Sequence, residues 1–223
     1  MARVAIDAVI FDLDGVIVDS YAPVTSAINA ALADHGIPTR PDGDLRRFIG
    51  PPTFTAFAEL TGEDADSAVV AAVVASYRAH YAGVYLAQTS VIEGMAPVLE
   101  ALAARLQLAI ATSKSATFTA PLLEALGLER FFAAVAAASP IDISDDKTTI
   151  VGRALDALDR PRAAMVGDRA FDIEAGLTHG LLAVGVTWGI GSADELRGAG
   201  AQEILDRPGE LLELLAGERR ARR

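Results

Sequence analysis

Short apolar runs, each about as long as one buried strand, constrain this 223-residue chain more than any other feature of its sequence. The runs cover residues 8–13, 106–112, 163–167 and 181–187. Segments with helical periodicity precede or separate the later runs, at residues 96–105, 117–126, 148–158 and 171–178. Gly127 follows the second of these helices, where a helix-terminating glycine belongs. Alternating strands and helices predict a doubly wound parallel α/β sheet, whose ligands bind beyond the carboxyl ends of the strands.

A helical block interrupts this alternation between residues 20 and 88. Its periodic segments are residues 24–33, 44–48, 54–60 and 65–85, and turn-forming Gly and Pro residues separate them. We therefore expect an all-helical domain, residues 17–89, inserted into an α/β core that comprises residues 1–16 and 90–223. The two crossings, near residues 16–19 and 90–94, are expected to act as hinges.

The composition narrows the functional classes. A net charge of −11 argues against a nucleic-acid surface, and the arginines within residues 218–223 are interpreted as a solvated tail. The chain has no cysteine, which excludes disulfides, thiolate zinc sites and a cysteine nucleophile. Its apolar runs are too short to span a membrane, and no signal-peptide pattern is present, so we expect a cytoplasmic protein. The sequence leaves the oligomeric state undetermined.

The first predicted strand continues into Asp12-Leu13-Asp14-Gly15. Residues two apart in an extended segment point the same way, so the carboxylates of Asp12 and Asp14 can face one site. They repel each other unless a cation lies between them or one of them takes up a proton. Gly15 allows a sharp turn directly afterwards. Since Asp pairs beside Gly also occur in ordinary turns, this motif needs support from elsewhere in the chain.

Two later segments supply groups that suit an anion. Thr112 ends the second predicted strand and Ser113 follows it, at a position where hydroxyl groups and free backbone N–H groups can cradle a phosphate. Capping of the following helix by Ser113 or Ser115 is the competing interpretation. Lys147 lies in the first turn of a helix, where the helix dipole disfavours a cation, so we expect it to reach inward to an anion.

Carboxylates also follow the third strand, at Asp168 and, four residues later, Asp172. Asp168, placed opposite the first Asp pair, would complete an oxygen-rich site of the kind that Mg²⁺ prefers. For Asp172, stabilisation of its own helix N-terminus is an alternative role. Each segment alone is ordinary, but four such segments at predicted strand ends indicate one shared site.

The order of these motifs resembles that of the haloacid dehalogenase-like hydrolase superfamily over essentially the whole chain. The motifs are Asp12-x-Asp14-Gly15, Thr112 or Ser113, Lys147, and Gly167-Asp168-x-x-x-Asp172. The helical insertion after the first motif is similar to the first-type cap of the phosphoglycolate phosphatase-like branch. The resemblance implies a Rossmann-like core and a Mg²⁺-dependent phosphatase that hydrolyses a small phosphomonoester, such as phosphoglycolate, a nucleotide or a sugar phosphate.

The resemblance also implies a role for each site residue. Asp12 would attack phosphorus and form an aspartyl-phosphate, and Asp14 would move protons. Mg²⁺ would bind Asp12, the backbone carbonyl of Asp14 and Asp168. Asp172 would orient these ligands from outside the coordination sphere. The phosphoryl oxygens would be held by Thr112, Ser113 and Lys147.

Val16 leaves other activities open. Many phosphatases of this kind have Thr after the Asp-Gly pair, whereas Val there is also found in the β-phosphoglucomutase branch. That branch usually has a His shortly after the first motif, and no His precedes His35 here, so a phosphomutase is the second choice. A non-catalytic binding protein with the same fold is the third. Within the helical block, candidates for recognising the leaving group include Tyr21, Arg46 and Arg47.

Overall fold

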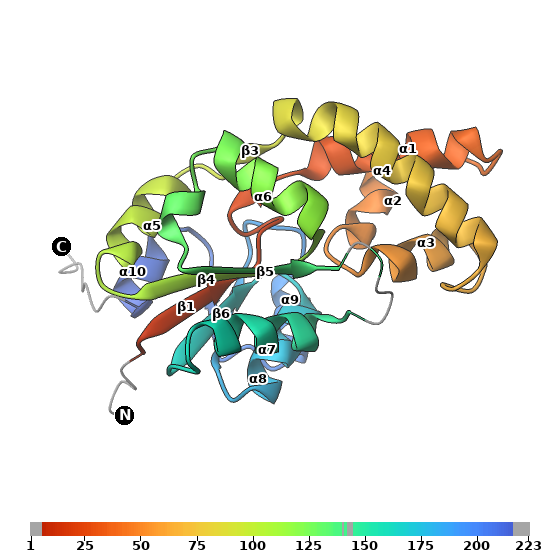
Figure 1. Cartoon of the computed structure of the whole chain (residues 1–223). Helices are drawn as coiled ribbons and strands as arrows, with labels where there is room; N and C mark the ends of the chain where they lie inside the picture. Colours follow the sequence, from red (N-terminus) through yellow and green to blue (C-terminus); the bar gives the residue numbers. More distant parts are fainter. Residues whose placement is uncertain (1–5, 140, 142–144, 216–223) are drawn as a thin grey trace.

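A parallel sheet forms the centre of the computed structural model, which describes residues 6–139, 141 and 145–215 (Figure 1). Its strand order is β5-β4-β1-β6-β7-β8, and every neighbouring pair is parallel. The strands are β1 (Ala8–Phe11), β4 (Gln107–Ser115), β5 (Ala134–Ala138), β6 (Ala163–Gly167), β7 (Leu182–Val186) and β8 (Glu203–Leu205). Because β1 lies between β4 and β6, the segments that follow these three strands meet at one edge of the sheet.

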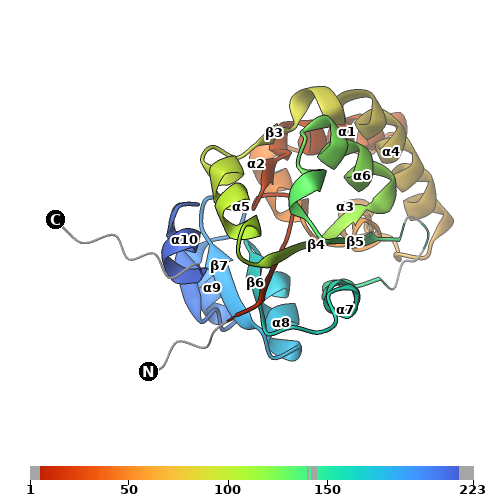
Figure 2. The same cartoon turned by 60° about the vertical axis from the view of Figure 1, so that its left-hand side comes forward.

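Helices cover both faces of the sheet (Figures 1 and 2). Val9 and Phe11 of β1 belong to the core that includes side chains of α5 (Met95–Ala103), α6 (Ala116–Ala125) and α10 (Glu210–Leu215). Ala8 and Ile10 belong to the opposite core, with side chains of α7 (Lys147–Ala157) and α8 (Ala170–Thr178). A strand buried on both faces has an uninterrupted apolar sequence, which is why β1 was recognisable. The remaining helix, α9 (Ala193–Gly198), packs Leu196 against α8 and β7.

The helical block between β2 and β3 contains α1 (Tyr21–Asp34), α2 (Asp42–Leu45), the 3₁₀ helix η1 (Arg46–Phe48), α3 (Thr53–Thr61) and α4 (Ala68–Gln88). The two crossings of the chain pair with each other as antiparallel strands, β2 (Val18–Asp19) and β3 (Ser90–Val91). A further bond, 2.9 Å long, runs from the N–H of Ile92 to the carbonyl of Ile17. The division into a core and an inserted domain at residues 17–89, with hinges at this ribbon, stays a proposal.

The predicted α/β class and parallel sheet are confirmed, but two strands of the sheet were missed. β5 reads Ala-Val-Ala-Ala-Ala and β8 has three residues, and both lie at sheet edges. Neither has the β-branched, buried pattern by which strands are recognised. The predicted end of β4 at Thr112 is also wrong, because pairing with β5 resumes at Ser115 after a register shift.

Among the described residues, no helix is both long and apolar enough to cross a membrane. The longest helix there, α4, has 21 residues. The arginines within residues 218–223, predicted to form a solvated tail, lie outside the described residues.

Candidate active site

The loop after β1 brings Asp12 and Asp14 to the sheet edge where β4 and β6 also end. The backbone N–H of Asp12 bonds to the carbonyl of Val166, which continues the pairing with β6. Gly15 then turns the chain with a φ of 82°. A Cβ atom on Gly15 would overlap the carboxylate of Asp168, so both the turn and the close approach require glycine.

Three buried carboxylates, those of Asp12, Asp168 and Asp172, each offer an oxygen within 4.8 Å of the others. Asp168 Oδ2 accepts a hydrogen bond from the N–H of Ile190 at 2.6 Å. Asp168 Oδ1 is buried and has no hydrogen-bond partner in the part of the chain that the structure describes. A buried carboxylate oxygen without a partner, beside two more carboxylates, is the arrangement that a metal ion satisfies.

Among the described residues, Lys147 is the cation that forms ion pairs with this cluster. Its Nζ lies 2.7 Å from Asp12 Oδ1 and 2.8 Å from Asp172 Oδ1. Asp146 caps α7 by accepting the N–H of Thr149, so the helix begins with Lys147 directed inward. Burial disfavours the charged ammonium, but the carboxylates of Asp12 and Asp172 outweigh it and raise the pKa of Lys147.

The carboxylates outnumber this ammonium. Burial raises the pKa of Asp12 above its ordinary value, although the charge of Lys147 opposes the change. Burial and the neighbouring charge of Asp172 likewise raise the pKa of Asp168 well above the ordinary value. The negative charge of the cluster is therefore only partly compensated by protein groups, and a divalent cation would fit there.

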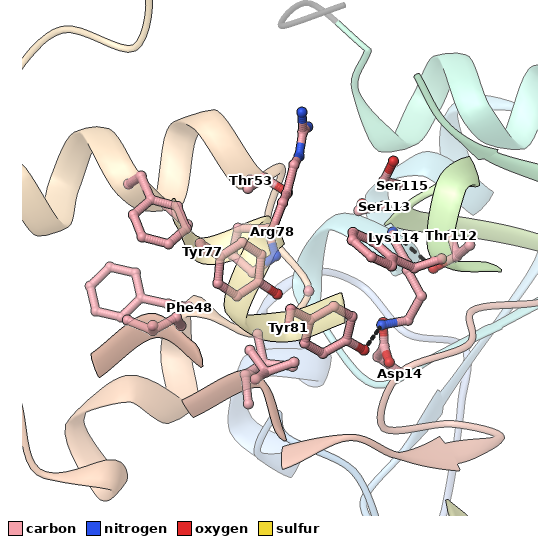
Figure 3. Close-up of a pocket in the computed structure, with 18 of the residues that line it drawn as sticks. Asp14, Phe48, Thr53, Tyr77, Arg78, Tyr81, Thr112, Ser113, Lys114 and Ser115 are labelled. Atoms are coloured by element: carbon pink, nitrogen blue, oxygen red, sulfur yellow. Dashed lines mark hydrogen bonds and ion pairs between the residues drawn. The ribbon is translucent and has the colours of Figure 1, made fainter. Parts of the chain in front are cut away.

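Asp14 has other partners. Its Oδ1 accepts the hydroxyl of Ser20 at 2.6 Å, and its Oδ2 lies 3.1 Å from Lys114 Nζ. The ammonium of Lys114 also bonds the hydroxyl of Tyr81, on α4, at 2.6 Å (Figure 3). Asp14 therefore connects, through Lys114, to the helical block.

Lys114 was not among the predicted site residues. Its side chain is only 5% exposed, and its backbone N–H donates to Thr112 Oγ1 at 3.1 Å. Burial opposes its charge, but Asp14 and Tyr81 outweigh this and raise the pKa of Lys114. The sequence could have indicated Lys114, because Lys114 and Lys147 are its only two lysines, and both lie in this candidate site.

The other predicted phosphate-binding groups lie on β4. Thr112 and Ser113 are buried and line the same cavity as Asp12. The capping interpretation of Ser113 is wrong, since Ser113 lies within β4, and Ser115 occupies the cap position of α6 without a side-chain capping bond. The hydroxyls of Ser113 and Ser115 have no hydrogen-bond partner among the described residues. Asp172, by contrast, does stabilise its helix start, since its Oδ2 accepts the N–H of Arg169 at 3.0 Å.

A cavity that is open to solvent lies above these groups (Figure 3). The core side presents Asp12, Asp14 and Thr112, and the helical block presents aromatic side chains, Phe48, Phe57, Tyr77 and Tyr81. The rings of Tyr77 and Tyr81 stack with centroids 5.6 Å apart. The core side of the cavity thus carries its carboxylates, and most of its aromatic rings come from the helical block.

The three predicted recognition residues do not line this cavity. Arg46 donates to the carbonyls of Gly189 and Ile190, and its guanidinium lies over the ring of Tyr21. Arg47 forms an exposed ion pair with Glu59. The arginine that does line the cavity is Arg78 of α4.

Comparison with known proteins places this geometry in a family. The family model described as haloacid dehalogenase-like hydrolase matches residues 9–186. Tyrosine-protein kinase PtkA of Mycobacterium tuberculosis is 38% identical over 192 residues, which are 83% of this chain but only 64% of PtkA. A phosphoglycolate phosphatase of Rhodospirillum rubrum is 31% identical over 209 residues, 89% of this chain and 86% of that protein.

A solved structure has the same fold. The crystal structure of a "predicted phosphatase" from Clostridium acetobutylicum matches with a TM-score of 0.90 and 29% identity, covering 96% of this chain and 100% of that one. The similarity to a phosphoglycolate phosphatase confirms the resemblance to that branch. The chain belongs to the haloacid dehalogenase-like hydrolase family.

Proposed function

We propose that this chain is a Mg²⁺-dependent phosphatase that hydrolyses a small phosphomonoester through an aspartyl-phosphate on Asp12. The observation that carries this proposal is the position of Asp12, whose buried carboxylate lies 2.7 Å from Lys147 and lines the cavity. The names of the relatives, a phosphoglycolate phosphatase and a phosphatase, support the reaction class.

Asp12 is the nucleophile in this mechanism. Lys147 holds Asp12 Oδ1 and fixes the orientation of the carboxylate. An Asp12 oxygen attacks phosphorus, an O–P bond to the enzyme forms, and the bond to the leaving-group oxygen breaks. Water then attacks the phosphorus of the aspartyl-phosphate, which releases phosphate and regenerates the carboxylate.

Asp14 moves the protons in both steps. It donates one proton to the departing alkoxide and later accepts one from the attacking water. Ser20 and Lys114 each contact one of its oxygens and so orient the carboxyl group. Thr112 and Lys147 supply donors to the phosphoryl oxygens.

Asp12 and Asp168 are the carboxylates that would hold Mg²⁺, together with the backbone carbonyl of Asp14. Asp168 Oδ1 has no hydrogen-bond partner among the described residues, so this oxygen is available to bind a metal ion. Both oxygens of Asp172 already have partners, Lys147 and the N–H of Arg169, which supports an orienting role for Asp172. Bound Mg²⁺ would neutralise charge on the phosphate and on the transition state.

Substitution of Asp12 tests the proposal. Asp12→Asn should abolish the hydrolysis of 4-nitrophenyl phosphate in the presence of Mg²⁺, because an amide cannot act as the nucleophile. Asp194→Asn, at an exposed carboxylate, is the matched control and should keep full activity. Full activity in a folded Asp12→Asn variant would remove the nucleophile assignment. Release of free phosphate from sugar phosphates by the wild type distinguishes the phosphatase from a phosphomutase.

A further inference from the structure

Arg78 lines the reaction cavity from α4, yet the proposed reaction gives it no role. It is half-buried and also lines a smaller adjoining cavity. Ser113 and Ser115 of β4 line both cavities too, whereas Thr112 and Lys114 line only the larger one. These three residues therefore line both cavities, and Figure 3 shows them at the larger one.

Arg78 has no carboxylate partner among the described residues. Its guanidinium lies over the ring of Phe54, 5.6 Å from the centroid. Burial lowers the pKa of Arg78, because partial removal from water disfavours the charged guanidinium. A carboxylate does line the smaller cavity, that of Asp145, but Arg153 contacts both of its oxygens, at 2.6 and 3.0 Å. The cation of Arg78 is thus left without an anion of the described chain.

The two serines add donors beside this cation. Ser113 is 7% exposed and Ser115 is 8% exposed, and neither hydroxyl has a hydrogen-bond partner among the described residues. Buried hydroxyls without partners destabilise a protein unless a ligand or water satisfies them. An anion that accepted both hydroxyls and paired with the guanidinium would satisfy all three groups.

We propose that Arg78, Ser113 and Ser115 form a second anion-binding subsite, which takes a carboxylate or phosphate group carried by the leaving group of the substrate. This inference rests on the proposed phosphatase function. It assigns Ser113 to the leaving group and leaves Thr112 and Lys147 for the phosphoryl group that reacts. The aromatic side chains Phe57 and Tyr77 line the same cavity, which favours a leaving group with an apolar or planar part.

Three aryl esters that differ only at the ring position opposite the phosphate test the subsite. They are phenyl phosphate, 4-carboxyphenyl phosphate and 1,4-phenylene bisphosphate. The wild type should prefer an anionic ester over phenyl phosphate by about tenfold or more in kcat/KM, the effect of roughly one charge-assisted contact. The carboxylate and bisphosphate arms identify which anion is favoured.

Arg78→Met should abolish this preference, mainly through KM, and Arg78→Lys should retain part of it because the charge remains. Ser113→Ala and Ser115→Ala should each reduce the preference by a smaller factor. Arg40→Met, at an exposed arginine of the same helical block, is the matched control and should keep the wild-type preference. The ratio of kcat/KM for two esters within one variant does not depend on the fraction of active protein. Comparing this ratio between variants cancels the intrinsic reactivity of the leaving groups.

Two negative results have different meanings. If the wild type releases no phosphate from any of the three esters, the proposed phosphatase function fails. If it hydrolyses phenyl phosphate but shows no preference that depends on Arg78, the phosphatase function stands and the second subsite is wrong.

Discussion

At the scale of single residues, Gly15 shows how the backbone and the carboxylate cluster depend on each other. Gly15→Ala should destabilise the fold by about 3 kcal/mol, the sum of a positive-φ cost and of overlap with Asp168. Gly36→Ala is the matched control, because Gly36 has a φ of 68° and nothing within 4 Å of an added Cβ. Urea unfolding measures both. Equal losses in the two variants would show that the approach of Asp168 does not require glycine.

Lys147 provides a second prediction at this scale. Lys147→Met leaves Asp12 and Asp172 buried without their cation, so we expect a loss of about 3–5 kcal/mol in unfolding free energy without metal. Activity should fall as well, since Asp12 is no longer oriented. Asp172→Asn combined with Lys147→Met should recover part of the stability, because it removes one unpaired charge. If the Lys147→Met variant were as stable as the wild type in EDTA, the ion-pair assignment would be wrong.

At the scale of elements, α4 of the helical block contacts the candidate active site through the hydroxyl of Tyr81, which bonds Lys114. Tyr81→Phe removes the bond to Lys114, 2.6 Å long, and leaves the stacked ring in place. We expect kcat to fall roughly tenfold, because Lys114 then positions Asp14 with one contact fewer. Tyr85, one turn further along α4, stacks on Tyr81 with centroids 5.3 Å apart and does not line the cavity. Steady-state kinetics of Tyr85→Phe should therefore match the wild type, and equal losses in both variants would indicate a packing effect.

At the scale of the whole molecule, metal binding should stabilise the fold. A ligand that binds only the folded state at one hundred times its Kd adds about 2.7 kcal/mol. We expect Mg²⁺ to raise the melting temperature of the wild type and EDTA to reverse the shift. Asp168→Asn should lose the response, because its free oxygen is the proposed ligand. Asp19→Asn, at an exposed carboxylate of β2, should keep it. If Mg²⁺ did not change the melting temperature of the wild type, the proposed metal site would be wrong.

The strands that carry the site were recognisable from the sequence because they are buried on both faces. β1, β4 and β6 have continuous apolar sequences with polar or glycine residues at their ends, and these are local properties. The parallel order followed from their alternation with helices. β5 escaped notice because an alanine-rich edge strand has no such pattern.

The sequence by itself determined the α/β class, and it placed Asp12, Lys147 and Asp168 of the candidate site at one edge of the sheet. These follow from apolar runs, glycine turns and helix starts, each of which acts over a few residues. Only the tertiary structure decided that Lys114 meets Tyr81, 33 residues away, and that Arg78 lines a cavity with Ser113. Such pairs depend on how α4 packs over the end of β4, which is set by side-chain packing between distant segments and leaves no local pattern in the sequence.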